Sequence, residues 1–319
     1  MIDEHPQHSW NAPEDTTNEP AQEMAEPLAV SAPEANDAPP IFQNYGADFP
    51  PVRIPHFGHF LLLCVFLLFG LFCAAMLSRV ALHLHWYGVT TLRAAVEDIH
   101  YELGSEAILY LFALAASLFL FPLVWDKGFF AGIQWNGATA IKLRWRLVSA
   151  AFGCLVLAAA SSTLVHGPDN APIDRIIRAP GAAWLLFAFG ITFAPFFEEL
   201  IFRGFLLPAL CTAVDWFGEK IAHQPRMPLG ENDAPQWTTT AMIAGSIATS
   251  IPFAAMHAEQ TGNAIGPLLL LGGVSLVLCA VRLKTKSLAA SVCVHALYNF
   301  VLFSIMLIGT QGFKHLDQM

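Results

Sequence analysis

Three ionisable residues interrupt an apolar segment in the second half of the chain. Glu198, Glu199 and Arg203 stand in the sequence Phe-Phe-Glu-Glu-Leu-Ile-Phe-Arg-Gly-Phe, which otherwise has the composition of a membrane helix. A charge at the centre of a spanning helix costs about 2.5–3.5 kcal/mol on insertion scales. Such residues persist mainly where they face a polar cavity, so this segment is a candidate functional site.

Spacing gives the two glutamates different roles. Glu199 and Arg203 are four residues apart with the acid first, the favourable order for an ion pair on one helix face. Glu198 is rotated from Glu199 by about 100°, so Arg203 does not neutralise it directly. Glu198 is therefore the freer carboxylate and the candidate general base. An ion-pair network that only locks helices together would explain Glu199 and Arg203 but not Glu198.

Two histidines and an asparagine lie on later apolar segments. His257 ends one of them, and His295 and Asn299, four residues apart, share a helix face of another. Each alone is compatible with packing or with hydrogen bonds between helices. Together with Glu198 they supply a base, two imidazoles and an amide donor. These groups can activate a water molecule and stabilise an oxyanion.

The elements that must position these residues are predicted to be membrane-spanning helices. Of the 319 residues, 55% are hydrophobic and only 13% are charged, whereas soluble domains average about 25% charged residues. Crossing roughly 30 Å of hydrocarbon needs about 20 apolar residues. On that length we predict seven spans, with eight as the alternative count, near 57–78, 105–125, 147–165, 182–208, 240–257, 264–281 and 287–309.

The predicted fold class is therefore all-α, a polytopic transmembrane helix bundle with a disordered acidic tail. Residues 1–56 carry ten acidic residues and one basic residue and are rich in Pro and Ala, a composition typical of disorder. We expect N-terminal transmembrane helices over 57–179, the core that carries the motifs over 180–310, and a short tail over 311–319. From residue 57 onward, 15 acidic residues balance 15 basic ones. No basic patch indicates a nucleic-acid partner.

Lysine and arginine counts predict the orientation in the lipid bilayer. If the N-terminus is cytoplasmic, the inside segments carry ten basic residues and the outside segments five, which agrees with the usual cytoplasmic excess. The N-terminal segment lacks the pattern of a cleavable signal peptide. Short loops favour a bacterial plasma membrane over a eukaryotic endomembrane. We expect an integral protein of that membrane.

In order and spacing, the three motifs resemble those of the CPBP family, which groups CAAX prenyl endopeptidases with bacteriocin-processing, Abi-like proteins. The resemblance covers roughly residues 180–310 and implies an intramembrane endopeptidase whose substrate is a membrane-embedded or lipidated peptide. The family patterns EExxxR, FxxxH and HxxxN are matched here by Glu198-Glu199-Leu-Ile-Phe-Arg203, Phe253-Ala-Ala-Met-His257 and His295-Ala-Leu-Tyr-Asn299.

The resemblance also implies residue roles. The implied roles are general base for Glu198, assistance for His257, oxyanion stabilisation for His295 and Asn299, and bracing of the site for Glu199 and Arg203. The family has been described both as metalloproteases and as glutamate-type proteases without metal. Zinc held by Glu198, His257 and His295 is one hypothesis, although the sequence has no HExxH and the ligands would come from three helices. Both chemistries stay open.

The predicted spans create a conflict within this site. Glu198 lies toward the cytoplasmic end of its span, whereas His257 lies at the outer end of its own. For these residues to meet, we expect the fourth helix to bend at Pro195, or the fifth to be shifted or broken near Pro252.

Two classes other than peptidases also fit the composition. One is a catalytically silent scaffold or a bacteriocin-immunity-type protein that binds a peptide without cutting it. The other is a transporter in which the carboxylates relay protons. No inverted repeat is evident in the sequence, which argues against the transporter.

Overall fold

The computed structural model describes residues 52–164, 181–230 and 233–314, with the side chains of 161–164 excepted. Nearly all of the predicted acidic tail, residues 1–51, lies outside the described residues, as does the end of the C-terminal tail. The regular elements of the described residues are all helices. The predicted all-α class is therefore confirmed.

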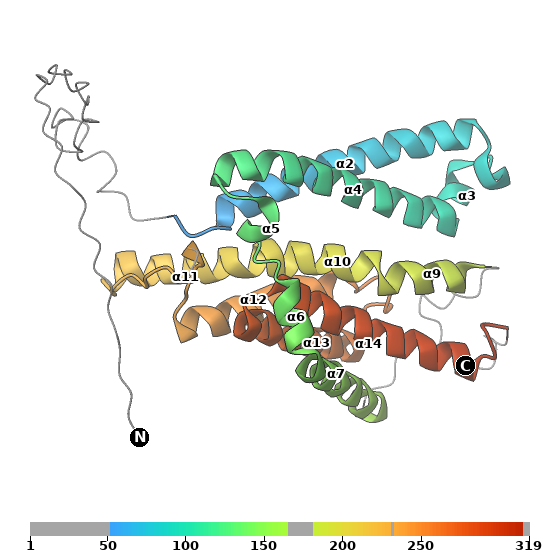
Figure 1. Cartoon of the computed structure of the whole chain (residues 1–319). Helices are drawn as coiled ribbons and strands as arrows, with labels where there is room; N and C mark the ends of the chain where they lie inside the picture. The colour runs from blue at the N-terminus through green and yellow to red at the C-terminus, as the bar shows by residue number, and fades with distance from the viewer. Residues whose placement is uncertain (1–51, 165–180, 231–232, 315–319) are drawn as a thin grey trace, which may run out of the picture. The chain divides into compact units, whose positions relative to one another are not determined.

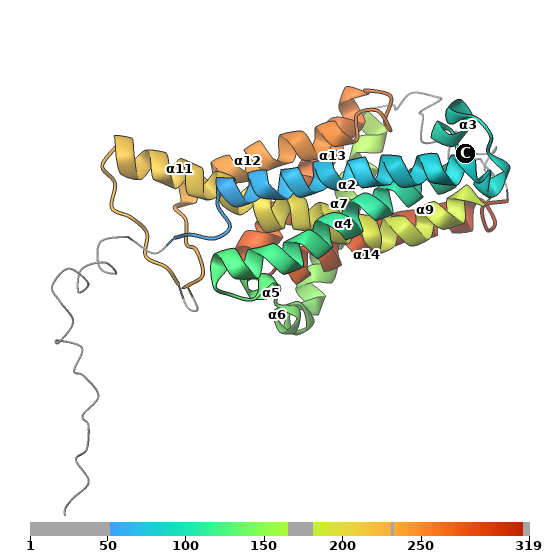
Figure 2. The same cartoon turned by 90° about the horizontal axis from the view of Figure 1, so that it is seen from above.

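The first half of the chain forms a helical hairpin followed by a third long helix. Figures 1 and 2 both show α2 and α4 running side by side in opposite directions. The elements are α2 (Phe57–His83), η1 (Trp86–Gly88), α3 (Leu92–Val96), α4 (Ile99–Trp125), α5 (Phe129–Gly132), α6 (Gly137–Lys142) and α7 (Arg144–Leu164).

The second half contains four segments that follow one another almost without interruption and then three long helices. Figure 1 shows α9, α10 and α11 continuing in one direction, with α12, α13 and α14 packed along them. The elements are α9 (Ala182–Ile191), α10 (Phe193–Glu199), the π-helical η2 (Leu200–Leu206), α11 (Leu207–Ile221), α12 (Thr239–Met256), α13 (Ile265–Thr285) and α14 (Leu288–Gly309).

Among the described residues, six helical segments are long and apolar enough to cross a membrane. They are α2, α4, the 40-residue stretch Ala182–Ile221, α12, α13 and α14. This confirms an integral membrane protein built as a helix bundle. The predicted third span corresponds to α7, but its C-terminal end at residue 165 lies outside the described residues, so the total of seven stays a prediction.

The close packing of α2 against α4 depends on a glycine. A Cβ atom added to Gly70 would lie 2.7 Å from the backbone oxygen of Leu109, too close for either helix to accommodate without moving. Small residues at such crossings let helix backbones approach in lipid, where no hydrophobic effect drives the helices together. Leu63 and Tyr110, one from each helix, are buried in the same apolar cluster. Gly70 therefore sets the separation within the hairpin.

Substitution of Gly70 by alanine is expected to destabilise the protein by about 1–3 kcal/mol, because the extra methyl group overpacks the helix crossing. Gly104 on α4 provides the matched control, since a Cβ there would meet nothing within 4 Å. Gly104→Ala should be neutral or stabilising by up to about 1 kcal/mol, the gain in helix propensity. Unfolding in mixed detergent micelles measures both, and equal effects would rule out the close crossing.

The stretch Ala182–Ile221 contains the predicted bend. Thr192 has φ −123° and ψ −74°, which separates α9 from α10. Pro195 explains the interruption, because a proline lacks an amide hydrogen and its ring clashes with the carbonyl group four residues earlier, that of Ile191. The helix is therefore interrupted at Thr192, three residues upstream of the predicted bend at Pro195. The same stretch runs past the predicted end at residue 208 to Ile221, which corrects the predicted fourth span.

The fifth helix was predicted to be shifted or broken near Pro252, and the structure shows no break there. Helix α12 continues from Thr239 to Met256 with Pro252 inside it. Its start is fixed by Asp215 of α11, whose carboxylate accepts hydrogen bonds from the backbone nitrogen and the hydroxyl of Thr238, at 3.1 and 2.6 Å. Farther along, Gly245 lies directly against Cys211. The two helices therefore run antiparallel in a fixed register.

This register resolves the conflict between Glu198 and His257. From Asp215 back to Glu198 is 17 positions along the α10–α11 stretch, and from Thr238, which Asp215 contacts, forward to His257 is 19 positions. At 1.5 Å per residue these intervals span roughly 26 and 28 Å. His257 is thereby brought to within one helical turn of the level of Glu198. The necessary shift comes from the length of α11 beyond the predicted span and not from a break at Pro252.

Candidate active site

A buried ion pair forms the base of the site. Arg203 Nη1 donates to Glu199 Oε1 at 2.8 Å, and both side chains are fully buried. The other guanidinium nitrogen, Nη2, donates to the backbone oxygen and the hydroxyl of Ser275 on α13, at 3.1 and 2.7 Å. This confirms the pair predicted from the i,i+4 spacing. It also ties the α10–η2 segment to α13.

Phe253 of α12 closes the other side of this ion pair. Its ring lies 4.4 Å from the Arg203 guanidinium carbon, within the range of a cation–π interaction. The same ring contacts both candidate imidazoles, with centroid distances of 5.1 Å to His257 and 6.0 Å to His295. Phe253 thus brings the Arg203 guanidinium and the two histidines into one neighbourhood.

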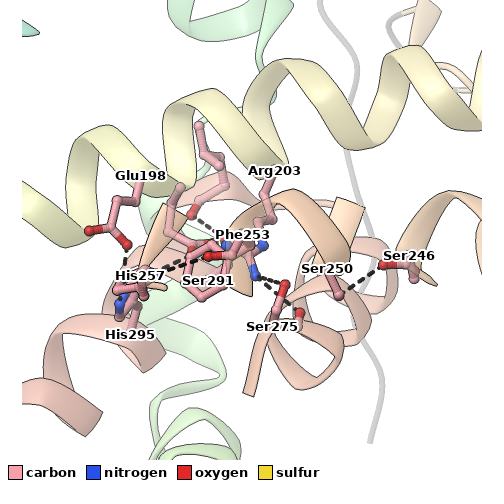
Figure 3. A network of polar contacts seen from close by, with 11 residues as sticks. Glu198, Arg203, Ser246, Ser250, Phe253, His257, Ser275, Ser291 and His295 are labelled. Carbon is pink, nitrogen blue, oxygen red and sulfur yellow. Dashed lines mark hydrogen bonds and ion pairs between the residues drawn. The ribbon is translucent and has the colours of Figure 1, made fainter. Parts of the chain in front are cut away.

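Glu198 is buried, but Arg203 forms its ion pair with Glu199 and not with Glu198. Glu198 is only 7% exposed. Its Oε2 atom has no hydrogen-bond partner among the described residues and lies 3.8 Å from His295 Nε2. Figure 3 shows the Glu198 carboxylate pointing toward the two imidazoles, away from Arg203. The separation of roles predicted for the two glutamates is present.

His295 connects the two glutamates. Its Nδ1 atom lies 3.1 Å from Glu199 Oε1, and its Nε2 atom faces Glu198 Oε2. Glu199 is paired with Arg203 and is therefore a carboxylate, which can only accept a hydrogen bond. The Nδ1 atom of His295 must then carry the proton in this contact. The ring orientation is fixed by a charged partner, as is usual for functional histidines.

His257 ends α12 and is held by the backbone of its own helix. Its Nδ1 atom lies 2.9 Å from the carbonyl oxygen of Phe253. A carbonyl oxygen only accepts, so Nδ1 carries a proton, and in a neutral imidazole Nε2 is then the free acceptor. The His257 ring is partly exposed. It can therefore present a lone pair to the space beside Glu198.

Asn299 lies one turn beyond His295 on α14 and contacts α9. Its side-chain nitrogen donates to the backbone oxygen of Gly190 at 2.8 Å. That carbonyl is next to the interruption at Thr192, where regular helical hydrogen bonds are lost. Gly190 also permits the close approach, because a Cβ there would lie 2.8 Å from the ring of Phe303. The predicted contribution of Asn299 to an oxyanion site stays a prediction, and in this structure one of its amide hydrogens stabilises the bend.

Residues 180–301 match the sequence model of the Rce1-like type II CAAX prenyl endopeptidases. This segment belongs to the Rce1-like family. The three motifs lie inside the matched range, so the family membership predicted from their spacing is confirmed. No curated protein and no solved structure matches the chain. The Rce1-like segment is thus a member of a family of membrane-embedded peptidases, while the first 179 residues lie outside the match.

The Rce1-like segment does not enclose its site alone. Tyr110 of α4 is 5% exposed and its ring stacks on Phe197, next to Glu198, with a centroid distance of 4.7 Å. Glu106, one turn earlier on α4, is partly buried and lies near Tyr110 and Glu198. Sequence reasoning missed both residues. Glu106 is a carboxylate within the predicted span 105–125, and this rarity in a membrane helix was the signal that could have indicated it.

The zinc hypothesis required Glu198, His257 and His295 to converge as ligands. In the part of the chain that the structure describes, no group of three or more His, Cys, Asp or Glu side chains is close enough to hold a metal ion. Glu198 and His295 lie 3.8 Å apart, but within the described ranges no hydrogen bond or ion pair joins either of them to His257. The three predicted ligands do not converge in this arrangement of the described residues, and the zinc site stays a prediction.

Proposed function

We propose that this protein is an intramembrane endopeptidase that hydrolyses a peptide bond in a membrane-embedded or lipidated substrate of the CAAX type. The observation that carries the proposal is the buried Glu198 carboxylate, whose Oε2 has no hydrogen-bond partner in the described part of the chain and lies 3.8 Å from His295 Nε2. Buried charged groups in a membrane are normally paired unless they serve a function. The Rce1-like membership supplies the class of reaction.

In the proposed reaction, Glu198 and His257 hold the attacking water. Both present acceptors, the Glu198 Oε2 atom and the His257 Nε2 lone pair, so each can receive one water hydrogen. Glu198 takes a proton as the water oxygen bonds to the substrate carbonyl carbon. The carbon–nitrogen bond then breaks, and Glu198 returns that proton to the leaving amine. Atoms and charge balance with water as the co-reactant.

The same geometry sets a condition on His295 as an oxyanion donor. Its Nδ1 proton is used in the contact with Glu199 at 3.1 Å. Stabilising an oxyanion through Nε2 requires a second proton, so the ring must be an imidazolium. The charges of these four groups then cancel, because the Glu198 and Glu199 carboxylates balance the Arg203 guanidinium and the His295 imidazolium. Such balance is favourable in a low-dielectric interior. The developing oxyanion then replaces Glu198 as the partner of Nε2–H.

Location and orientation belong to the same proposal. The excess of basic residues on one side supports a cytoplasmic N-terminus in a bacterial plasma membrane. The bilayer and the lipidated or membrane-embedded substrate are the expected partners. The alternative function is a scaffold or immunity-type protein with the same fold, which would bind the peptide and release it uncut.

Purified full-length protein in proteoliposomes should cleave members of a fluorogenic library of membrane-anchored peptides. Within the library, prenylated CAAX peptides are expected to be cut faster than the same peptides without the lipid, because burial of the lipid chain supplies binding energy. Mass spectrometry of the products locates the cut. Binding of labelled peptides with no product at any enzyme concentration would favour the scaffold.

Addition of the chelator 1,10-phenanthroline tests whether cleavage needs a bound metal or proceeds by glutamate-type catalysis without one. Cleavage that depends on Glu198 and His257 alone is expected to stay within about twofold of the untreated rate, since no step of general acid–base catalysis needs a metal. The control is a non-chelating phenanthroline isomer at the same concentration. Inhibition by the chelator that is reversed by added zinc would instead assign Glu198, His257 and His295 as ligands.

A further inference from the structure

A groove separate from the active site runs between α12 and α13. It consists of two adjoining cavities of about 630 and 500 Å³, which share Ile247 and Leu276 as lining residues. The apolar residues along the groove include Ile243, 58% exposed, and Leu269, 71% exposed. We call this feature the α12–α13 groove.

The groove has a cationic end. Arg282, Lys284 and Lys286 line the larger cavity together with Trp237. None of the three cations forms an ion pair with a carboxylate of the described residues. Trp237, whose indole nitrogen donates to Thr212 at 3.0 Å, is the residue type enriched at membrane interfaces. Charge and aromatic content thus mark this end as the level of lipid headgroups.

The buried position of Arg282 is explained neither by the helix dipole nor by an ion pair. The two lysines are exposed at the C-terminal end of α13, where any cation is favoured by the helix dipole. Arg282 is only 2% exposed, its Nη2 donates to the backbone oxygen of Ile133 at 3.3 Å, and its Nε has no hydrogen-bond partner among the residues that the structure describes. Glu199 is already paired with Arg203. A buried guanidinium without an adjacent anion is unfavourable unless an anion binds beside it.

We propose that the α12–α13 groove binds an anionic phospholipid, with its phosphate beside Arg282, Lys284 and Lys286 and an acyl chain along Ile247 and Leu276. Charge complementarity at one end and exposed apolar side chains along the rest favour this occupant. Basic pockets between transmembrane helices bind acidic headgroups, and juxtamembrane cations attract anionic lipid. This inference is independent of the peptidase proposal.

Bound lipid would also support the helix that braces the active site. Ser275 of α13 is fully buried and accepts the hydrogen bonds of Arg203, while the next residue, Leu276, lines the groove. One face of α13 therefore contacts the ion pair and the neighbouring face contacts the lipid. Occupancy is expected to raise the unfolding temperature of the protein by mass action.

Native mass spectrometry of the purified full-length protein tests the proposal with phosphatidylglycerol and phosphatidylcholine. The parent is expected to retain phosphatidylglycerol in preference to phosphatidylcholine. The double variant Lys284→Gln/Lys286→Gln should bind phosphatidylglycerol roughly 10- to 30-fold more weakly, as two headgroup contacts are lost. The matched control is Lys142→Gln/Lys220→Gln, which removes two exposed lysines outside the groove and should bind like the parent.

A second variant addresses the apolar half of the site. Leu276→Trp keeps every charge but fills the groove, so it should also weaken phosphatidylglycerol binding. Inorganic phosphate at millimolar concentration should not displace the lipid, and full displacement would mean an anion site without lipid selectivity. The proposal is overturned if the parent shows no headgroup preference, if the lysine control loses as much binding as the groove variant, or if Leu276→Trp binds normally.

Discussion

Replacement of Glu198 by glutamine is expected to lower the rate of peptide cleavage by about 10²–10⁴-fold, the usual contribution of a general base. Glutamine preserves the shape of the side chain but cannot take a proton from water. The residue is nearly buried, and its Oε2 makes no hydrogen bond that the substitution would break. The protein should therefore fold normally and still bind its substrate. The measurement is the single-turnover rate of cleavage in proteoliposomes.

Glu97→Gln serves as the control for this experiment. Glu97 is an exposed carboxylate paired with the exposed Arg93, so its removal should leave the cleavage rate unchanged. Equal unfolding profiles for parent and Glu198→Gln would confirm that the loss is chemical. A folded Glu198→Gln protein that retains more than about a third of the parent rate would contradict the assignment of Glu198 as the base.

Replacement of Arg203 by methionine is expected to destabilise the protein by about 3–5 kcal/mol, because it leaves a fully buried carboxylate without its cation. Glu199 would lose its 2.8 Å partner, and the hydroxyl of Ser275 would lose its 2.7 Å donor. The contact with the Phe253 ring would be lost as well. Unfolding in mixed micelles measures the change in free energy.

Two further variants separate the charge effect from a general loss of packing. Arg93→Met breaks an ion pair whose side chains are 92% and 68% exposed, and its effect should be below about 0.5 kcal/mol. The double variant Glu199→Gln/Arg203→Met removes both charges and should recover part of the stability lost by Arg203→Met alone. No recovery in the double variant would mean that the ion pair is not the source of the loss.

Much of the site could be predicted because it depends on intervals within single helices. Four residues separate Glu199 from Arg203, and this interval alone predicts their pairing and leaves Glu198 free. The rarity of charge in lipid made the same residues conspicuous. The family motifs then selected two of the twelve histidines. His295 indeed contacts both glutamates.

The contacts between different helices could not be predicted from intervals within one helix. Ser275 and Phe253 complete the environment of Arg203, yet neither type is unusual in a membrane helix. Glu106 and Tyr110 come from the hairpin outside the family match. The level of His257 follows from where α12 begins relative to α11, which Asp215 sets through Thr238. Local sequence carries no signal for such pairing between helices.

The contact of Asp215 with Thr238, the N-cap of α12, makes chain length a functional variable. One residue inserted between Thr239 and His257 would turn the imidazole by about 100° and move it by about 1.5 Å away from Glu198. The same insertion in the connection 222–237 would leave α12 fixed at its start. Homologous sequences should therefore differ in the number of residues in that connection, while the interval of 17 positions from Asp215 back to Glu198 and that of 19 positions from Thr238 to His257 stay constant.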